Sequence, residues 1–311
     1  MQWGHIKTLF ILSFLILDIY LLVQFVQKQE EADNGILANR ELSFEDQLKA
    51  ENITIPKLET REIEKEPYIS VSQRILTKED LQPLMANKGL HTEVIDNYFI
   101  VSQLEDPLPI EQDTSGEKIS EIVKSYLLFP EQYTYWGWNK DLNVLIFFQK
   151  INDRPVYFNQ NGLVLAFLNE SNEITHLTQT LLGEVAPQGE LQTLIQPIRS
   201  IEALYNRGYL NADEKVTGDV VLGYYARLTE GNPVFAPTWK VSVNGENNGG
   251  RNYFVNAIEG LASPGNEIDF LISTIDSDEK KIITLNNDSE VIQSFLDVIN
   301  KLEIDNRSVA E

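Results

Sequence analysis

An apolar run near the amino terminus, from Leu9 to Val26, is the feature that most constrains how this chain can fold. Only Ser13, Asp18 and Gln24 within it are clearly polar. As a helix rising about 1.5 Å per residue, the run would reach roughly 27 Å, close to the thickness of bilayer hydrocarbon. Each Leu, Ile, Phe or Val favours insertion by about 0.3–0.6 kcal/mol, and together they outweigh the roughly 2.5–3.5 kcal/mol that a central Asp costs. The run therefore predicts a transmembrane helix.

The residues around this run predict its topology. No small-residue cleavage pattern follows it, because the chain continues "QKQEEADNGILANRE", so an uncleaved signal anchor is favoured over a removed signal peptide. Lys7 and the terminal amine precede the run, whereas Glu30 and Glu31 follow soon after it. This weak positive-inside bias places the short tail in the cytoplasm. We expect a single-pass protein of the cell membrane whose carboxy-terminal region is extracellular.

Asp18 lies near the midpoint of the predicted span, and an intramembrane carboxyl group usually hydrogen-bonds to polar groups of another helix. A single-span protein has no second transmembrane helix, so that helix would belong to another chain. The simpler alternative is that Asp18 is only tolerated, neutral by protonation or reaching the interface past Tyr20. Helical spacing places four apolar residues on or near the face of the aspartate. The predicted partner-contact residues are Ile11, Phe14, Asp18, Leu22 and Phe25.

Composition excludes several function classes. The net charge of -22 argues against binding to nucleic acid or to an anionic membrane surface, since most faces of the protein would repel phosphate. The chain has no cysteine, which rules out disulfides, thiolate nucleophiles and thiolate metal ligands. Hydrophobic residues make up 42% of the sequence, which is enough for the core of one or two folded domains.

Composition and patterning also predict the domain organisation. The predicted parts are a cytoplasmic tail (1–8), a transmembrane signal anchor (9–26), a charged juxtamembrane stalk (27–66), a first external module (67–185), a second external module (186–305) and a tail (306–311). Within the stalk, Ser43 to Ala50 is predicted to be helical. The first module is expected to begin with a strand, a helix capped by Thr77 and a second strand.

A sequence pattern that occurs twice in the chain suggests that the two modules are related. "EIVKSY" and "SIEALY" are amphipathic, and each precedes a Pro-Val-aromatic stretch, "NDRPVYF" and "EGNPVFA". The distances from Tyr126 to Pro155 and from Tyr205 to Pro233 are 29 and 28 positions. Chance similarity is the alternative. Short polar loops favour hairpins, so we predict an α+β fold in which two repeated modules of antiparallel sheet with packed helices follow the single transmembrane helix.

Further elements are predicted for the helix of the second module and for the end of the chain. A helical stripe is predicted from Leu191 to Tyr205, interrupted by Pro197 and closed by Gly208. After Ala262, two short strands are expected near "IDFLIST" and "KIITL", with "DSDEK" as the hairpin turn between them. A last helix is expected to begin at the capping pair of Asn287 and Glu290.

No catalytic constellation is visible in the sequence. The three histidines are scattered, and neither a metalloprotease, a nucleophile-elbow nor a phosphate-loop pattern occurs. "DSDEK" lacks the glycine and distal glutamate of a calcium loop. The aromatic stretch "YTYWGW" could form a binding surface, but alternating aromatics in a strand are more often packed in a core. We therefore expect no enzyme activity, no cofactor and no metal.

Several stretches together resemble the YycI family of Gram-positive Firmicutes. They are the opening "MQWGHIKTLFILSFLILDIYLLVQF", "SFEDQLKAENITIP", "VFAPTWKV" and "YFVNAIEG", and the similarity extends over the whole chain. The resemblance implies a membrane-anchored regulator that acts with a YycH-like partner on the sensor histidine kinase WalK (YycG), and through WalR (YycF) on cell-wall metabolism. It also implies repeated external α+β domains. It identifies no catalytic residues.

A function of another class stays open beside this one. An anchored extracellular module could bind a cell-wall fragment or a peptide, in a groove between the modules or on the aromatic strand. An anchored hydrolase is the least favoured alternative, because its motifs are missing. Neither the sign of the effect on the kinase nor the formation of a homo-oligomer follows from the residues.

Overall fold

The structure is a computed structural model that describes residues 7, 11–12, 14–15, 17–22, 43–58, 64–227, 233–245, 250–284 and 289–309. The chain divides into two compact units. The first comprises residues 1–54 with 211–214, and the second comprises residues 55–210 with 215–311.

The described residues of the amino-terminal run are helical, namely 11–12, 14–15 and 17–22. Within the described part of the chain, no helix is both long enough and apolar enough to cross a membrane. The predicted span from 9 to 26 includes residues 9, 10, 13, 16 and 23–26, which lie outside the described residues. The transmembrane helix therefore stays a prediction.

The first unit also contains helix α2 (Phe44–Ala50), which confirms the helix expected in the stalk. Ser43 caps it, because its Oγ accepts a hydrogen bond from the backbone N–H of Asp46 at 3.2 Å. Leu48 is 2% exposed. The turn after the helix is joined to residues 211–214 by a hydrogen bond of 2.8 Å from Asn52 Nδ2 to Asp213 Oδ1.

Among the described residues, all the strands and five α-helices belong to the second unit. The strands are β1 (Lys65–Gln73), β2 (Leu90–Ile95), β3 (Phe99–Pro109), β4 (Tyr133–Asn139), β5 (Val144–Ile151), β6 (Arg154–Tyr157), β7 (Leu163–Leu168), β8 (Glu173–Gln179), β9 (Leu182–Thr193), β10 (Lys215–Arg227), β11 (Val234–Asn244), β12 (Arg251–Asn256) and β13 (Ala262–Gly265). The helices are α3 (Lys78–Met85), α4 (Gly116–Lys124), the short 3₁₀ helix η1 (Pro130–Gln132), α5 (Pro197–Asn206), α6 (Glu267–Thr284) and α7 (Glu290–Val309). The α+β class is thus confirmed.

The strands join in the order β13-β12-β11-β10-β6-β5-β7-β8-β3-β2, and β1, β4 and β9 pair off this path. The pairs are antiparallel, as predicted, except for the parallel pair of β6 and β10. Strand β1 pairs with both β9 and β11, so Ile69 lies opposite Pro187 and Phe235. The predicted module boundary after residue 185 falls inside β9. Strands of both predicted modules therefore share one sheet, and their origin by repetition stays a prediction.

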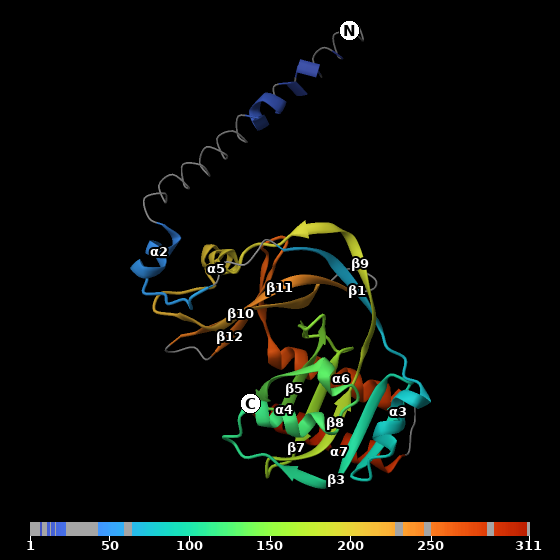
Figure 1. Ribbon diagram of the computed structural model, residues 1–311. Helices are drawn as coiled ribbons and strands as arrows, with labels where there is room; N and C mark the ends of the chain where they lie inside the picture. Colours follow the sequence, from blue (N-terminus) through green and yellow to red (C-terminus); the bar gives the residue numbers. More distant parts are fainter. Residues whose placement is uncertain are drawn as a thin grey trace. The chain divides into compact units, whose positions relative to one another are not determined.

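Two core layers cover the two faces of the central strands β5 and β7. On one face, Leu145 and Phe147 pack in a cluster with residues of α3 and α4. On the other face, Ile146 and Phe148 pack in a cluster with residues of α6 and α7. Because successive side chains of a strand point to opposite faces, a strand covered on both faces is apolar throughout. Figure 1 shows α4 and the pair α6 and α7 beside these strands.

The expectation of two strands after Ala262 is wrong, because residues 267–284 form the helix α6. Its buried side chains include Leu271, Ile275, Asp278 and Ile282. These positions are spaced three or four residues apart, which is helical periodicity. The β-branched isoleucines favoured strands locally, but burial of this stripe overrides that preference. "DSDEK" accordingly lies within a helix and not in a hairpin turn.

Two other helix boundaries refine the sequence prediction. Helix α5 begins at Pro197, where the missing N–H costs no helical hydrogen bond, so this proline starts the helix and does not interrupt it. Leu191, expected on the helical stripe, is instead 64% exposed on β9. The last helix is present as predicted, but α7 begins at Glu290, which the expected capping pair had placed three residues after the cap; Asn287 lies outside the described residues.

Candidate partner-binding surface

Four of the five predicted partner-contact residues are described, and each lies in a helical segment with an exposed side chain. Ile11 is 67%, Phe14 54% and Leu22 61% exposed, and Asp18 is exposed as well. Their spacing of three and four residues places them on one helix face. Phe25 lies outside the described residues. The contact of this face with a partner stays a prediction.

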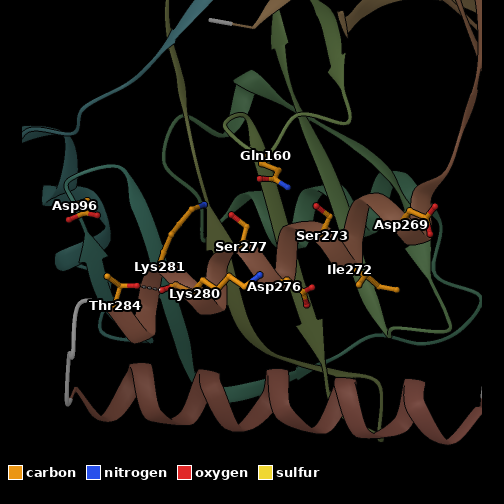
Figure 2. A pocket seen from close by; sticks show the side chains of 10 residues that line it. All are labelled: Asp96, Gln160, Asp269, Ile272, Ser273, Asp276, Ser277, Lys280, Lys281 and Thr284. Carbon is orange, nitrogen blue, oxygen red and sulfur yellow. Dashed lines mark hydrogen bonds between the residues drawn. The ribbon is translucent and has the colours of Figure 1, made fainter. Parts of the chain in front are cut away.

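The second unit carries an open groove along α6, which we call the α6 groove, with a volume of about 820 Å³. One wall is the face of α6 that bears Asp269, Ser273, Asp276 and Lys280, and Figure 2 shows Asp96 and Gln160 on the other side of it. Asp96 occupies the β2–β3 turn with φ of 51°. Nine of the ten lining residues are polar, and their charges are of both signs.

Below the groove, α6 turns a carboxylate toward the core. Asp278 is 5% exposed and accepts a hydrogen bond of 2.9 Å from Lys281 Nζ. Burial raises the pKa of Asp278 to about 6, although the ammonium group of Lys281 acts in the opposite direction. Lys281 Nζ also lies 5.4 Å from the centre of the Phe99 ring. Sequence reasoning missed this pair because it placed the segment in a turn.

His176 lies in β8 and is a core residue. It is 3% exposed, its Nδ1 is 3.1 Å from Thr175 Oγ1, and its Nε2 has no hydrogen-bond partner among the described residues. Burial lowers the pKa of His176 to about 4. An imidazole whose pKa burial holds well below neutral is a weak proton acceptor, so His176 is poorly suited to act as a general base.

Opposite pH effects are expected from these two groups. The folded state resists protonation of His176, so the contribution of His176 to stability falls as the pH drops from 6.5 toward 4. The folded state favours protonation of Asp278, so the contribution of Asp278 to stability falls as the pH rises toward 6. When the pH is lowered from 7 to 5, the free energy of unfolding of His176→Leu should rise by about 2 kcal/mol relative to that of the wild type. Over the same range, the free energy of unfolding of Asp278→Asn should fall by about 1 kcal/mol relative to that of the wild type. Urea unfolding of the full chain across this range, above the isoelectric point of about 4.5, measures both slopes. Parallel slopes would contradict the assignment.

A half-buried ion-pair cluster joins residues 64–66 to the centre of the sheet. Arg154 Nη2 donates to Glu64 Oε2 at 2.7 Å, and Nη1 donates to Glu66 Oε1. Tyr224 Oη donates to Glu66 Oε2 at 3.4 Å. Burial alone would lower the pKa of Arg154, but the bonds to Glu66 and Glu64 hold it above its ordinary value. The cluster is an ordinary structural contact and offers no nucleophile.

The aromatic stretch "YTYWGW" forms β4 and packs in the core, as predicted. Tyr133 is fully buried, and Tyr135 and Trp136 each lie 5.2 Å from a phenylalanine ring of the neighbouring strand β5. Trp136 Nε1 also donates to Glu267 Oε2 at 2.6 Å, which ties β4 to the start of α6. No local pattern in the sequence pointed to Glu267.

Metal-ligating side chains do not cluster in the described part of the chain, where no group of three or more His, Cys, Asp or Glu could hold an ion. The geometry instead presents an exposed helical face, a polar groove and a packed core.

Comparison with known proteins gives one family. A family model described as YycI protein matches residues 32–258. The match covers more than two thirds of the chain and ends before α6 and α7. No curated protein matches the chain.

Proposed function

This chain belongs to the YycI family, and from that membership we propose that it is a membrane-anchored accessory regulator of the sensor histidine kinase WalK (YycG). In this proposal it acts with a YycH-like protein, and the kinase controls cell-wall metabolism. The role is regulatory and not catalytic. The proposed location is the cell membrane, with a cytoplasmic amino terminus, one transmembrane helix and an extracellular second unit.

The proposed contact with the partner proteins rests on the exposed apolar helix face around Asp18. Large apolar side chains are about half exposed or more on every side of this segment, including Ile11, Phe14 and Leu22, so Asp18 is what distinguishes this face from the others. An apolar face of this size needs a bilayer or another protein to cover it. A carboxyl group in hydrocarbon is costly unless it meets a polar group, and a partner helix would supply one. We therefore place the contact with WalK and the YycH-like protein on this face.

Replacing Asp18 with leucine tests the contact. Asp18→Leu should leave membrane insertion intact or improve it, because about 2.5–3.5 kcal/mol of opposing transfer free energy is removed. Association with the kinase should weaken from a few-fold to roughly thirtyfold, since interhelical hydrogen bonds contribute about 0.6 to 2 kcal/mol. In-membrane crosslinking to the kinase at matched expression, together with a kinase-dependent reporter, measures the change.

The matched control moves the acid around the helix. Asp18→Leu combined with Tyr20→Asp keeps one carboxyl group in the span but turns it by about 200°. This variant should not recover association. Full association and unchanged reporter output in Asp18→Leu would show that the aspartate is only tolerated.

The α6 groove favours a second candidate function, that of an anchored extracellular module binding a cell-wall fragment or a peptide. Its volume of about 820 Å³ lies in the range of ligand sites. The Asp18 variants separate the two functions. A ligand-binding module would keep its ligand affinity in Asp18→Leu, whereas a regulator that acts through helix contacts would lose output.

A further inference from the structure

Helix α2 ends in a hydrogen-bonded turn. The backbone N–H of Asn52 donates to Lys49 O at 3.1 Å, and that of Ile53 donates to Leu48 O at 2.8 Å. Asn52 has a φ of 55°, so these two bonds form the Schellman ending of a helix. The two residues that this ending brings together, Leu48 and Ile53, are 2% and 5% exposed. An isolated helix of seven residues is unstable in water, so other parts of the chain hold α2 in place.

The end of α2 is bonded to the turn formed by residues 211–214, which belongs to the same unit. The backbone N–H of Asp213 donates to Glu51 O at 2.9 Å. Asn52 Nδ2 adds the bond of 2.8 Å to Asp213 Oδ1. Asn52 and Asp213 are 161 positions apart in the chain, so these bonds are tertiary contacts.

A buried carboxylate shapes the 211–214 turn. Glu214 is 4% exposed, and its two carboxylate oxygens accept bonds of 3.0 Å from the backbone N–H and the Nδ2 of Asn211. The backbone oxygen of Glu214 accepts a further bond of 3.0 Å from the N–H of Thr54. The turn is therefore held by contacts of its own and offers α2 a preformed partner. Strand β10 begins at the next residue, Lys215.

We propose that α2 and the 211–214 turn form a latch that opens and closes while the sheet stays folded. The latch consists of a short helix and a four-residue turn, whereas the strands β5 and β7 are buried along almost their whole length. Segments with less buried surface open at a lower free energy than core strands do. The latch therefore opens before the core does.

The latch decides which part of the fold bears a pull on the amino-terminal chain. Tension passes along a covalent chain whatever its conformation, so a pull on the residues before Ser43 reaches α2. While the latch is closed, the pull passes from α2 to the 211–214 turn and to the start of β10. When the latch is open, the pull passes only along the chain from residue 55 onward. The inference does not rest on the proposed function, because every contact of the latch lies within this chain.

Hydrogen–deuterium exchange of the full chain in nonionic detergent tests the latch. Mass spectrometry with electron-transfer fragmentation follows the amides of Thr54 and Asp213, which donate the backbone bonds across the latch. Both should exchange at least about tenfold more slowly than in an unstructured chain and at least about tenfold faster than the amides of β5 and β7. Exchange at the unstructured rate would show that α2 is not docked. Exchange as slow as that of β5 would show that the latch does not open by itself. Either result would overturn the proposal.

Leu48→Ala tests whether the two segments open together. The substitution removes a buried side chain from α2 and should speed the exchange of Thr54 and Asp213 by about tenfold or more, with β5 unchanged. Leu84→Ala on α3 is the matched control, since Leu84 is 4% exposed, and it should leave both amides unchanged. Unchanged exchange of Asp213 in Leu48→Ala would overturn the latch.

Asn52→Gly tests the side-chain bond alone. Glycine adopts a φ of 55° without strain, so the helix ending is kept while the bond to Asp213 Oδ1 is lost. The exchange of the Thr54 and Asp213 amides should become about two- to tenfold faster. Because this change is small, it stays informative even if Leu48→Ala unfolds α2. Unchanged exchange of both amides in this variant would also contradict the proposal.

Discussion

Phe295→Ala is expected to lower the free energy of unfolding by about 3–5 kcal/mol, because it removes a fully buried ring and leaves a cavity that the core fills only in part. The ring of Phe295 lies 5.1 Å from that of Phe167 and 5.9 Å from that of His176, so it joins α7 to strands β7 and β8. Urea unfolding followed by tryptophan fluorescence measures the loss, since Trp136 and Trp239 lie in the second unit.

Ile283→Ala is the control, because Ile283 is 58% exposed on α6 and its truncation removes little buried surface. If Phe295→Ala cost no more than this control, α7 would not be part of the cooperative core. The outcome matters because α7 lies beyond the residues that match the YycI family.

Gly223→Val should destabilise the protein by about 3 kcal/mol or more, at or above the upper end of overpacking effects. A Cβ atom at Gly223 would lie 2.6 Å from the carbonyl oxygen of Pro155 and would also meet the ring of Tyr157. The backbone there forms the parallel pair of β6 with β10, in which Tyr224 lies opposite Val156. The added side chain must therefore separate two strands, since no flexible chain end can give way alone.

Gly137→Val is the matched control for this substitution. Gly137 also lies in a strand, but a Cβ atom there would have no neighbour within 4 Å. Its change in unfolding free energy, read from the same urea transitions, should stay within about 1 kcal/mol. Equal losses in the two variants would show that the close contact between β6 and β10 is not what makes Gly223 intolerant of a side chain.

Local signals in the sequence were sufficient for several elements. Helix α3 begins after Thr77, as expected, because the capping box with Asp80 needs residues only three positions apart. The strand β4 could be recognised as core, since its aromatic alternation is a property of neighbouring residues. The face around Asp18 was defined from helical spacing alone, and its contact with a partner stays a prediction. Whether a partner covers that face is not a property of local sequence.

Long-range contacts decided the rest. Residues 267–284 contain isoleucines that favour strands, and only the core beneath them selects the helical stripe that buries Asp278. The pairing of β1 with β9 and β11 joins segments more than a hundred positions apart. Tyr225 of β10 stacks on Phe254 of β12 because strand β11 lies between them in the sheet, an arrangement that no window of sequence contains.

The sequence by itself determined the apolar amino-terminal run, the acidic charge, the family resemblance and the α+β class, because each depends on composition or on spacing within one element. The tertiary structure alone decided that strands of both predicted modules share a sheet, that α6 is a helix, and that Tyr225 of β10 stacks on Phe254 of β12. The physical reason is that local periodicity selects the type of an element, whereas burial and backbone pairing between distant segments select its neighbours.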